Sequence, residues 1–387
     1  MTNRFQIRMT FFLPALLAVV ALSAVFSLPA AAQQFGPWSA PVNLNQDNLN
    51  ACTQLGIDLA SCPVVNSKCD DQHPTLSKDG LSLIFSSTRP QDPTLTTCDV
   101  ALHLWVSQRD SLDSPWQTPQ PLTMLNSLDS SPFQDHAPNL TTDGHWLFFH
   151  SSRGDGSCNG GGRAELWVAH RQDKRNDFEW ETPINLGCTL NISGADDAGP
   201  NFWEDDTIGT LYLYFTRNLT PANADGFDIY LSTCNTDLDS CNRQQLWGAP
   251  ELVPELSSSV RDTRTALRRR DGLEMIITSR RCNSPIPSTD LPLCSTRSAG
   301  GLDLWSSTRD SVQLSQSNWT TPVNLNQDNV AKCDQLGISP CPVVNTQAND
   351  GAPALSWDGQ TMIFYSNRSG GAGGNDLYMS TRQKLPD

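Results

Sequence analysis

Several signatures of well-known chemistries are absent from this sequence. It contains no G-x-S-x-G elbow, no H-E-x-x-H helix and no Walker loop, which excludes three common catalytic and phosphate-binding templates. No two cysteines have the C-x2-C spacing of a thiolate zinc site. Basic residues are also scarce, with 26 lysines and arginines against 41 acids and a net charge of −15. Nucleic acid is therefore excluded as a partner, because phosphate binding requires a cationic surface.

Long apolar runs are confined to the N-terminus. Arg4 and Arg8 precede an apolar stretch from Phe11 to about Phe26, and the small residues at 30–32 are typical of a cleavage site. The stretch is too short for a membrane span. We therefore predict a signal peptide over residues 1–32, a secreted or periplasmic protein, and no membrane span after cleavage.

The twelve cysteines fit an oxidising compartment, and their even number favours disulfides. Sequence does not determine connectivity, so the pairing of near neighbours is a hypothesis. The pairs it suggests are 52–62, 69–98, 158–188, 234–241, 282–294 and 333–341.

A repeat occurs five times along the rest of the chain. Each copy begins with a short strand pattern, a tight turn and a strongly apolar strand, at residues 73–89, 136–153, 199–217, 264–281 and 352–368. Four of the turns are Asp-Gly, a pair that accepts the positive φ of a tight hairpin. A second apolar strand follows, at 103–109, 165–171, 228–233, 303–309 and 376–382. A W-x-x-P unit closes the copy at 116–119, 180–183, 247–250 and 319–322.

The last copy has no closing unit of its own, but Trp38-Ser39-Ala40-Pro41 stands near the other end of the chain. This permutation predicts an all-β, five-bladed β-propeller of four-stranded blades, in which the N-terminal strand completes blade 5. No long amphipathic helix is predicted. Within a single propeller over 33–387 we expect the closing strand at 33–45, an insertion at 46–70, blade 1 at 71–124, blade 2 at 125–187, blade 3 at 188–254, blade 4 at 255–325, a second insertion at 326–350 and blade 5 at 351–387.

These motifs resemble the WD40-like β-propeller repeat of TolB-type envelope proteins. The resemblance rests on P-x-L-S-x-D-G-x-x-L-x-F-x-S-x-R, on D-L-W/Y-x-S-x-R and on W-x-x-P-x-N-L. Such propellers serve mostly as interaction platforms. The resemblance therefore implies a non-catalytic binding module for a protein or glycan in the envelope or outside the cell. We also expect a monomer.

An aspartate recurs near the start of the inner strand in every copy, at Asp71, Asp135, Asp197, Asp262 and Asp350. Repeat symmetry predicts that the five form a ring around the axis, which could hold Ca²⁺. An arginine ends the second strand of every copy, at Arg89, Arg153, Arg217, Arg280 or Arg281, and Arg368. A ring of structural ion pairs is therefore the competing interpretation.

A second resemblance, to five-bladed glycosidases, gives the alternative function of a polysaccharide-active hydrolase. Those enzymes use carboxylates at the starts of inner strands, so Asp71, Asp135 and Asp197 are compared with their base, modulator and acid, although the third role belongs to a glutamate there. His73 and His136 lie beside the ring. Together with Asp262 and Asp350, they are candidate ligand-binding residues at the rim, since imidazole serves as a ligand and as an acid or base.

Overall fold

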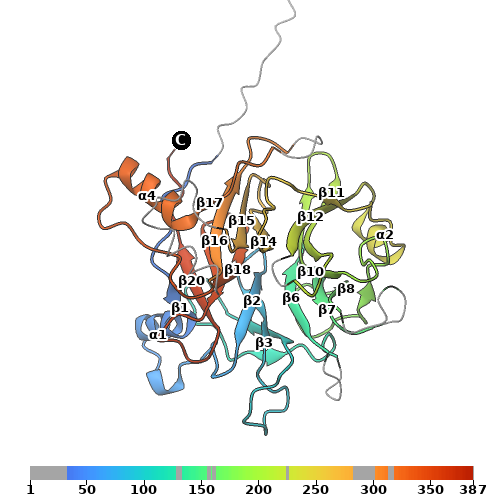
Figure 1. Cartoon of the computed structure of the whole chain (residues 1–387). Helices are drawn as coiled ribbons and strands as arrows, with labels where there is room; N and C mark the ends of the chain where they lie inside the picture. Colours follow the sequence, from blue (N-terminus) through green and yellow to red (C-terminus); the bar gives the residue numbers. More distant parts are fainter. Residues whose placement is uncertain are drawn as a thin grey trace, which may run out of the picture. The chain divides into compact units, whose positions relative to one another are not determined.

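Five repeated segments each form a four-stranded antiparallel sheet in the computed structural model (Figure 1). The structure describes residues 33–127, 133–154, 158, 163–223, 226–281, 301–312 and 318–386. The predicted signal peptide at 1–32 lies outside these residues.

The blades follow one another along the chain. Blade 1 contains β2 (Asp71–Leu76), β3 (Ser82–Ser87), β4 (His103–Gln108) and β5 (Gln120–Pro121). Blade 2 contains β6 (Asp135–Leu140), β7 (Trp146–Ser151), β8 (Glu165–His170) and β9 (Ile184–Asn185). Blade 3 contains β10 (Asp196–Asp205), β11 (Thr210–Asn218), β12 (Phe227–Cys234) and β13 (Glu251–Leu252). Blade 4 contains β14 (Asp262–Leu267), β15 (Glu274–Ser279), β16 (Asp303–Thr308) and β17 (Val323–Asn324).

Blade 5 combines the two ends of the chain, as the sequence predicts. Its strands are β18 (Asp350–Leu355), β19 (Thr361–Ser366), β20 (Asp376–Thr381) and β1 (Val42–Asn43). In the outer pair, Val42 lies opposite Met379. Each inner strand contacts the inner strands of both neighbouring blades, so the five sheets close into a ring. The predicted five-bladed propeller is confirmed.

Short helices decorate the ring. They are α1 (Leu44–Leu55), the 3₁₀ turn η1 (Leu59–Ser61), α2 (Leu238–Arg243) and α4 (Leu325–Leu336). Sequence analysis missed α1 and α4, which occupy the two insertions. Each is capped by an asparagine side chain at its start, Asn43 or Asn324, and by a left-handed glycine at its end, Gly56 or Gly337. No helix among the described residues is long and apolar enough to cross a membrane.

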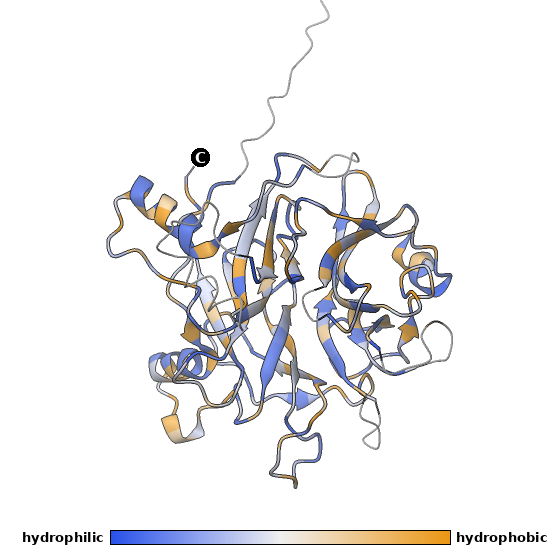
Figure 2. Ribbon diagram, in the orientation of Figure 1, coloured by the Kyte–Doolittle hydropathy of each residue, from blue (hydrophilic) through white to orange (hydrophobic). Residues whose placement is uncertain are grey.

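The hydrophobic core is divided among the five interfaces between neighbouring sheets. Each interface holds one cluster of buried apolar side chains, and hydrophobic residues recur along the central strands in Figure 2. Each cluster also contains one tryptophan of a W-x-x-P unit, namely Trp38, Trp116, Trp180, Trp247 and Trp319. Because central strands bury both faces, one blade alone cannot be stable and the ring must close.

In four blades, the arginine that ends the third strand links that strand to the Asp-Gly turn of the same blade. In blade 5, the Arg382 guanidinium lies 4.2 Å from the Trp38 ring centroid, and its Nε donates to the carbonyl of Gly359. Arg109, Arg171 and Arg309 make the same two contacts. Blade 3 has Cys234 at this position, bonded to Cys241. A disulfide thus takes the place of the stacked cation.

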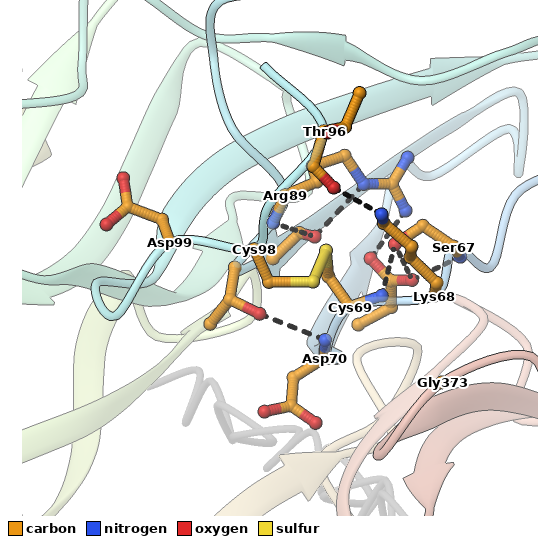
Figure 3. The surroundings of a disulfide bond; sticks show 12 residues. Ser67, Lys68, Cys69, Asp70, Arg89, Thr96, Cys98, Asp99 and Gly373 are labelled. Atoms are coloured by element: carbon orange, nitrogen blue, oxygen red, sulfur yellow. Dashed lines mark hydrogen bonds and ion pairs between the residues drawn. A yellow bond between two sulfur atoms is a disulfide. The ribbon is translucent and has the colours of Figure 1, made fainter.

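The structure contains five of the suggested disulfides. They join Cys52 to Cys62, Cys69 to Cys98, Cys158 to Cys188, Cys234 to Cys241 and Cys333 to Cys341. The sixth suggested pair, 282–294, lies outside the described residues. Figure 3 shows the bond between Cys69 and Cys98, which holds the loop before β2 against the loop after β3, beside Arg89. Five disulfides fit an oxidising compartment outside the cytoplasm.

Every inner strand contains a bulge two residues after its recurring aspartate, which is Asp71, Asp135, Asp197, Asp262 or Asp350. The residue at this position has a positive φ in each blade, namely His73, Ala137, Gly199, Arg264 and Ala352. The pairing register with the second strand shifts at the same place. In blades 1, 2, 3 and 5 a proline follows, which has no amide proton to donate to the ladder. The bulge determines which side chains reach the axis.

Candidate functional site

The five ring aspartates are buried and bonded to arginine. Each side chain has no exposed surface. In blade 5, Asp350 Oδ1 accepts from Arg368 Nη2 at 2.6 Å, and its Oδ2 accepts from the backbone amide and the hydroxyl of Thr346. The matching pairs are Asp71 with Arg89, Asp135 with Arg153, Asp197 with Arg217, and Asp262 with Arg281. Each arginine also donates to a backbone carbonyl of the loop that precedes the inner strand.

These contacts match the structural interpretation of the ring. Each pair ties the start of an inner strand to the end of its neighbour and to the incoming loop. A substrate would reach Asp71, Asp135 or Asp197 only after the guanidinium moved away. A catalytic role for these three, and a ligand-binding role for Asp262 and Asp350, stay predictions. Burial raises the pKa of Asp197 to about 6, against the opposing effect of Arg217.

The described residues contain no cluster of side chains that would support the predicted Ca²⁺ site. Among the residues that the structure describes, no group of three or more His, Cys, Asp or Glu side chains is placed to hold a metal ion. The ring carboxylates point toward arginines, which already use their oxygens.

Three imidazoles meet near the axis. The ring centroids of His73 and His136 lie 5.3 Å apart, and those of His136 and His150 lie 3.6 Å apart. His150 comes from β7, directly opposite His136. Its Nδ1 accepts from the amide of Gly199, whereas the buried Nδ1 atoms of His73 and His136 have no partner in the described part of the chain. Burial, together with the charge of Arg264, lowers the pKa of all three well below 6.5. The imidazoles are therefore neutral at neutral pH.

Arg264 lies beside this cluster and differs from the ring arginines. It forms no ion pair or hydrogen bond with any described residue, and its Nη1 is buried without an acceptor. Burial and the nearby charge of Arg261 lower its pKa to about 9. Its guanidinium lies where a side chain on Gly199 would be, since an added Cβ there would come within 2.3 Å of Nη1. Glycine at 199 thus makes room for the cation.

His136, His150 and Arg264 line a pocket of about 460 Å³ among blades 2, 3 and 4, here called the axial pocket. Among the described residues of its lining, Asp196 provides a carboxylate. The Asp196 side chain is 24% exposed, and its Oδ1 lies 3.7 Å from Arg163 Nη1. The described residues of the lining are Phe133, Gln134, His136, His150, Ser152, Ala164, Asp196, Ala198, Phe227, Arg261 and Arg264. Its volume falls within the range of small-molecule sites, about 300–1,000 Å³.

Arg269 obstructs the far end of the axis. It extends from blade 4, and its guanidinium donates to the carbonyls of Leu140 and Leu76, at the ends of the inner strands of blades 2 and 1. The cavity that it lines between the inner strands is only about 30 Å³. The axial pocket is therefore approached from the aspartate end.

A larger cavity of about 790 Å³ lies at the Asp-Gly turns of blades 1 and 2. Its arginines include Arg109 and Arg171, which are the stacked arginines of those blades. Their guanidinium groups already donate to turn carbonyls. This cavity therefore follows from the repeat, and the axial pocket is the stronger candidate site.

Sequence reasoning found two residues of the cluster and missed the others. His73 and His136 do lie together, but they occupy different positions in the repeat, two residues and one residue after the aspartate. Arg264, His150 and Asp196 were not selected as site residues. One signal was available for Arg264, because its equivalents in blades 2, 3 and 5 are alanine or glycine.

No family model matches the chain, and no curated protein sequence matches it. Solved structures do match. One described as a glycoside hydrolase has a TM-score of 0.50 and 11% identity, covering 91% of this chain and 93% of that one. Another, described as an RGII complex of BT0996, has a TM-score of 0.50 and 10% identity, covering 91% and 92%. An α-L-arabinofuranosidase from Lactobacillus brevis is 13% identical with a TM-score of 0.47, covering 82% and 92%.

These comparisons correct two predictions. The assignment to the WD40-like TolB-type family is wrong, since no family model matches. The motifs behind it encode tight turns and buried strands, which propeller blades of many families need. The expectation of a non-catalytic binding module is also wrong, since a matching structure with a TM-score of 0.50 is described as a glycoside hydrolase and the alternative hydrolase hypothesis agrees better. At these identities the likeness shows the fold alone: the chain shares a five-bladed propeller fold with glycoside hydrolases.

Proposed function

We propose that this protein hydrolyses glycosidic bonds of a polysaccharide in the periplasm or outside the cell, with the axial pocket as its active site. One observation supports this most: neutral imidazoles, a carboxylate and an unpaired guanidinium share one cavity at the end of the propeller where the inner strands begin. Unpaired buried ionisable groups are concentrated at functional sites.

Hydrolysis of a glycosidic bond requires an acid that protonates the leaving oxygen and a base or nucleophile at the sugar carbon. Asp196 supplies a partly exposed carboxylate to the pocket, and its ion pair with Arg163 is long, at 3.7 Å. His136 supplies a neutral imidazole with an unused Nδ1. We assign the base to His136, whose neutral imidazole takes a proton from the attacking water. Asp196 in its protonated form is assigned as the acid, which gives its proton to the leaving oxygen as the glycosidic bond breaks; the two replace the buried Asp71, Asp135 and Asp197 in these roles.

The test is a turnover screen of the purified exported protein on neutral and acidic polysaccharides, with new reducing ends as the readout. Asp196→Asn and His136→Gln should each lower the rate by about 100-fold or more, the usual effect of losing an acid or base. Asp239→Asn is the matched control, since Asp239 is exposed on α2 and bonded to Arg243. Absence of new reducing ends on every polysaccharide, or a product with an unsaturated ring, would overturn hydrolysis.

A further inference from the structure

The axial pocket has the opposite charge balance to the rest of the protein. The chain carries a net charge of −15. In the described lining, the guanidinium of Arg264 has no ion-pair partner among the described residues, and the carboxylate of Asp196 is already near Arg163. A local cationic site within an acidic protein favours an anionic ligand that enters this pocket.

Arg264 is the group in need of a partner. The ring arginines each donate to a buried carboxylate and a carbonyl, as Arg368 does to Asp350 and Val344. Arg264 has neither among the described residues, although its Nη1 is buried. A buried guanidinium without a counter-ion is strongly unfavourable, so its presence indicates that an anion completes the site.

The surroundings hold this cation in place. Gly199 leaves room for the guanidinium, and the bulge at Arg264, with φ of 48°, directs the side chain toward the axis. The open Nδ1 atoms of His73 and His136 are additional hydrogen-bonding groups beside it. A cation preorganised in this way loses little conformational freedom when a ligand binds.

From this geometry we infer that the axial pocket binds the carboxylate of an acidic sugar, a uronate residue, through Arg264. A guanidinium matches a planar carboxylate with two parallel hydrogen bonds. The imidazoles can bond sugar hydroxyls, and Phe227 provides an apolar ring at the pocket wall. The cavity of about 460 Å³ has room for a sugar ring as well as the carboxylate. This inference rests on the proposed function, because it names the substrate class of the same site.

Titration calorimetry with the exported protein tests it. Galacturonate and glucuronate oligosaccharides are compared with galactose and glucose oligosaccharides of equal length, and with acetate and inorganic sulfate. We expect a uronate oligosaccharide to bind at least tenfold more tightly than its neutral counterpart, acetate or sulfate. Equal binding of neutral and uronate sugars, or preferential binding of sulfate or acetate, would overturn the inference.

Substitutions of Arg264 test whether this residue binds the uronate carboxylate. Arg264→Met should weaken uronate binding about 10- to 100-fold, the equivalent of one charged hydrogen-bonding partner, and leave neutral sugars unaffected. Arg264→Lys keeps the positive charge but lacks the two parallel N–H donors of a guanidinium, so an intermediate loss of uronate affinity is expected. Arg243→Met, at an exposed arginine on α2, is the matched control. Unchanged uronate binding in a folded Arg264→Met or Arg264→Lys protein would contradict the assignment.

The binding assay separates the two proposals. Uronate binding that depends on Arg264, without turnover of any polysaccharide, would overturn hydrolysis and keep the inference. Turnover of neutral polysaccharides alone, unaffected by Arg264→Met, would keep hydrolysis and overturn the inference.

Discussion

Two kinds of arginine at the aspartate end of the propeller differ in their partners. Five of them, one per blade, lie in a ring and each bonds a fully buried aspartate. Arg264 lies nearer the axis and has no such partner among the described residues. The first group follows the repeat, and the second breaks it. Repetition therefore marks residues that every blade needs for folding, whereas departure from the repeat marks the candidate site.

The largest effect is expected from a ring aspartate. Asp135→Asn leaves Arg153 without its carboxylate, and breaking a buried pair costs about 3–5 kcal/mol of unfolding free energy. Arg153 keeps some exposure, so the lower end applies. Urea unfolding measures the loss, with exposed Asp239→Asn expected to change stability by less than about 0.5 kcal/mol. A loss under about 1 kcal/mol combined with abolished turnover would instead support a catalytic Asp135.

Arg264→Met is expected to increase the free energy of unfolding, the opposite of the effect of Asp135→Asn. It removes an unpaired buried charge and keeps the length of the side chain, so the ligand-free protein should gain about 1–3 kcal/mol of unfolding free energy. Urea unfolding without and with a uronate oligosaccharide measures this, because the ligand should stabilise the native sequence more than the variant. A clear loss of stability in the variant would show that Arg264 belongs with the structural arginines.

The imidazoles should make stability depend on pH. The pKa values of His73, His136 and His150 are lowered by burial, so below about pH 6.5 the unfolded chain binds protons that the folded chain does not. Stability is complete above that pH and falls by about 1.4 kcal/mol per pH unit for each imidazole as the pH decreases.

Protonation of Asp197 has the opposite effect on stability to protonation of the imidazoles. Its pKa, raised to about 6, makes the folded chain bind a proton first, which offsets one imidazole below pH 6. Urea unfolding between pH 7.5 and 5 should therefore show a net loss toward acid. His136→Gln should reduce that loss of stability by the contribution of one imidazole, about 1.4 kcal/mol per pH unit. A flat profile in the native protein would mean that the imidazoles protonate in the folded state.

The smallest effect concerns the bulge of blade 4. Prolines 74, 138, 200 and 353 follow the positive-φ residue in the other blades, whereas blade 4 has Thr265, whose buried hydroxyl has no partner among the described residues. Thr265→Pro should stabilise the protein by about 0.4–1 kcal/mol by restricting the unfolded chain. Thr265→Val is the control that removes the hydroxyl alone. Destabilisation by proline but not by valine would show that blade 4 has a different backbone at this position.

Much of the fold was predictable because it is encoded by local signals repeated five times. Asp-Gly turns, alternating strands and W-x-x-P units recur in register, and Trp38 revealed which strand completes blade 5. The helices of the insertions were missed, although Asn43 and Gly56 are ordinary capping residues. Their apolar faces are short, so periodicity alone did not reveal them.

The candidate site was only partly predictable. Asp71 and Arg89 are far apart in sequence, yet the repeat suggested their pairing because both ends recur in all five blades. The same repetition also suggested a catalytic role for these acids, and only burial separates the two interpretations. His150 and Asp196 carry no repeated signal, so nothing local pointed to the axial pocket.

The sequence by itself determined the number of blades, the way the ring closes and the partners within each blade, because these depend on short segments that fold alike wherever they occur. The tertiary structure alone decided which side chains reach the axis. A bulge turns the strand by one residue, and a neighbouring glycine decides whether a long side chain fits. Arg264 reaches the axial pocket because both conditions are met there: the bulge lies in its own blade 4, and Gly199 lies in blade 3.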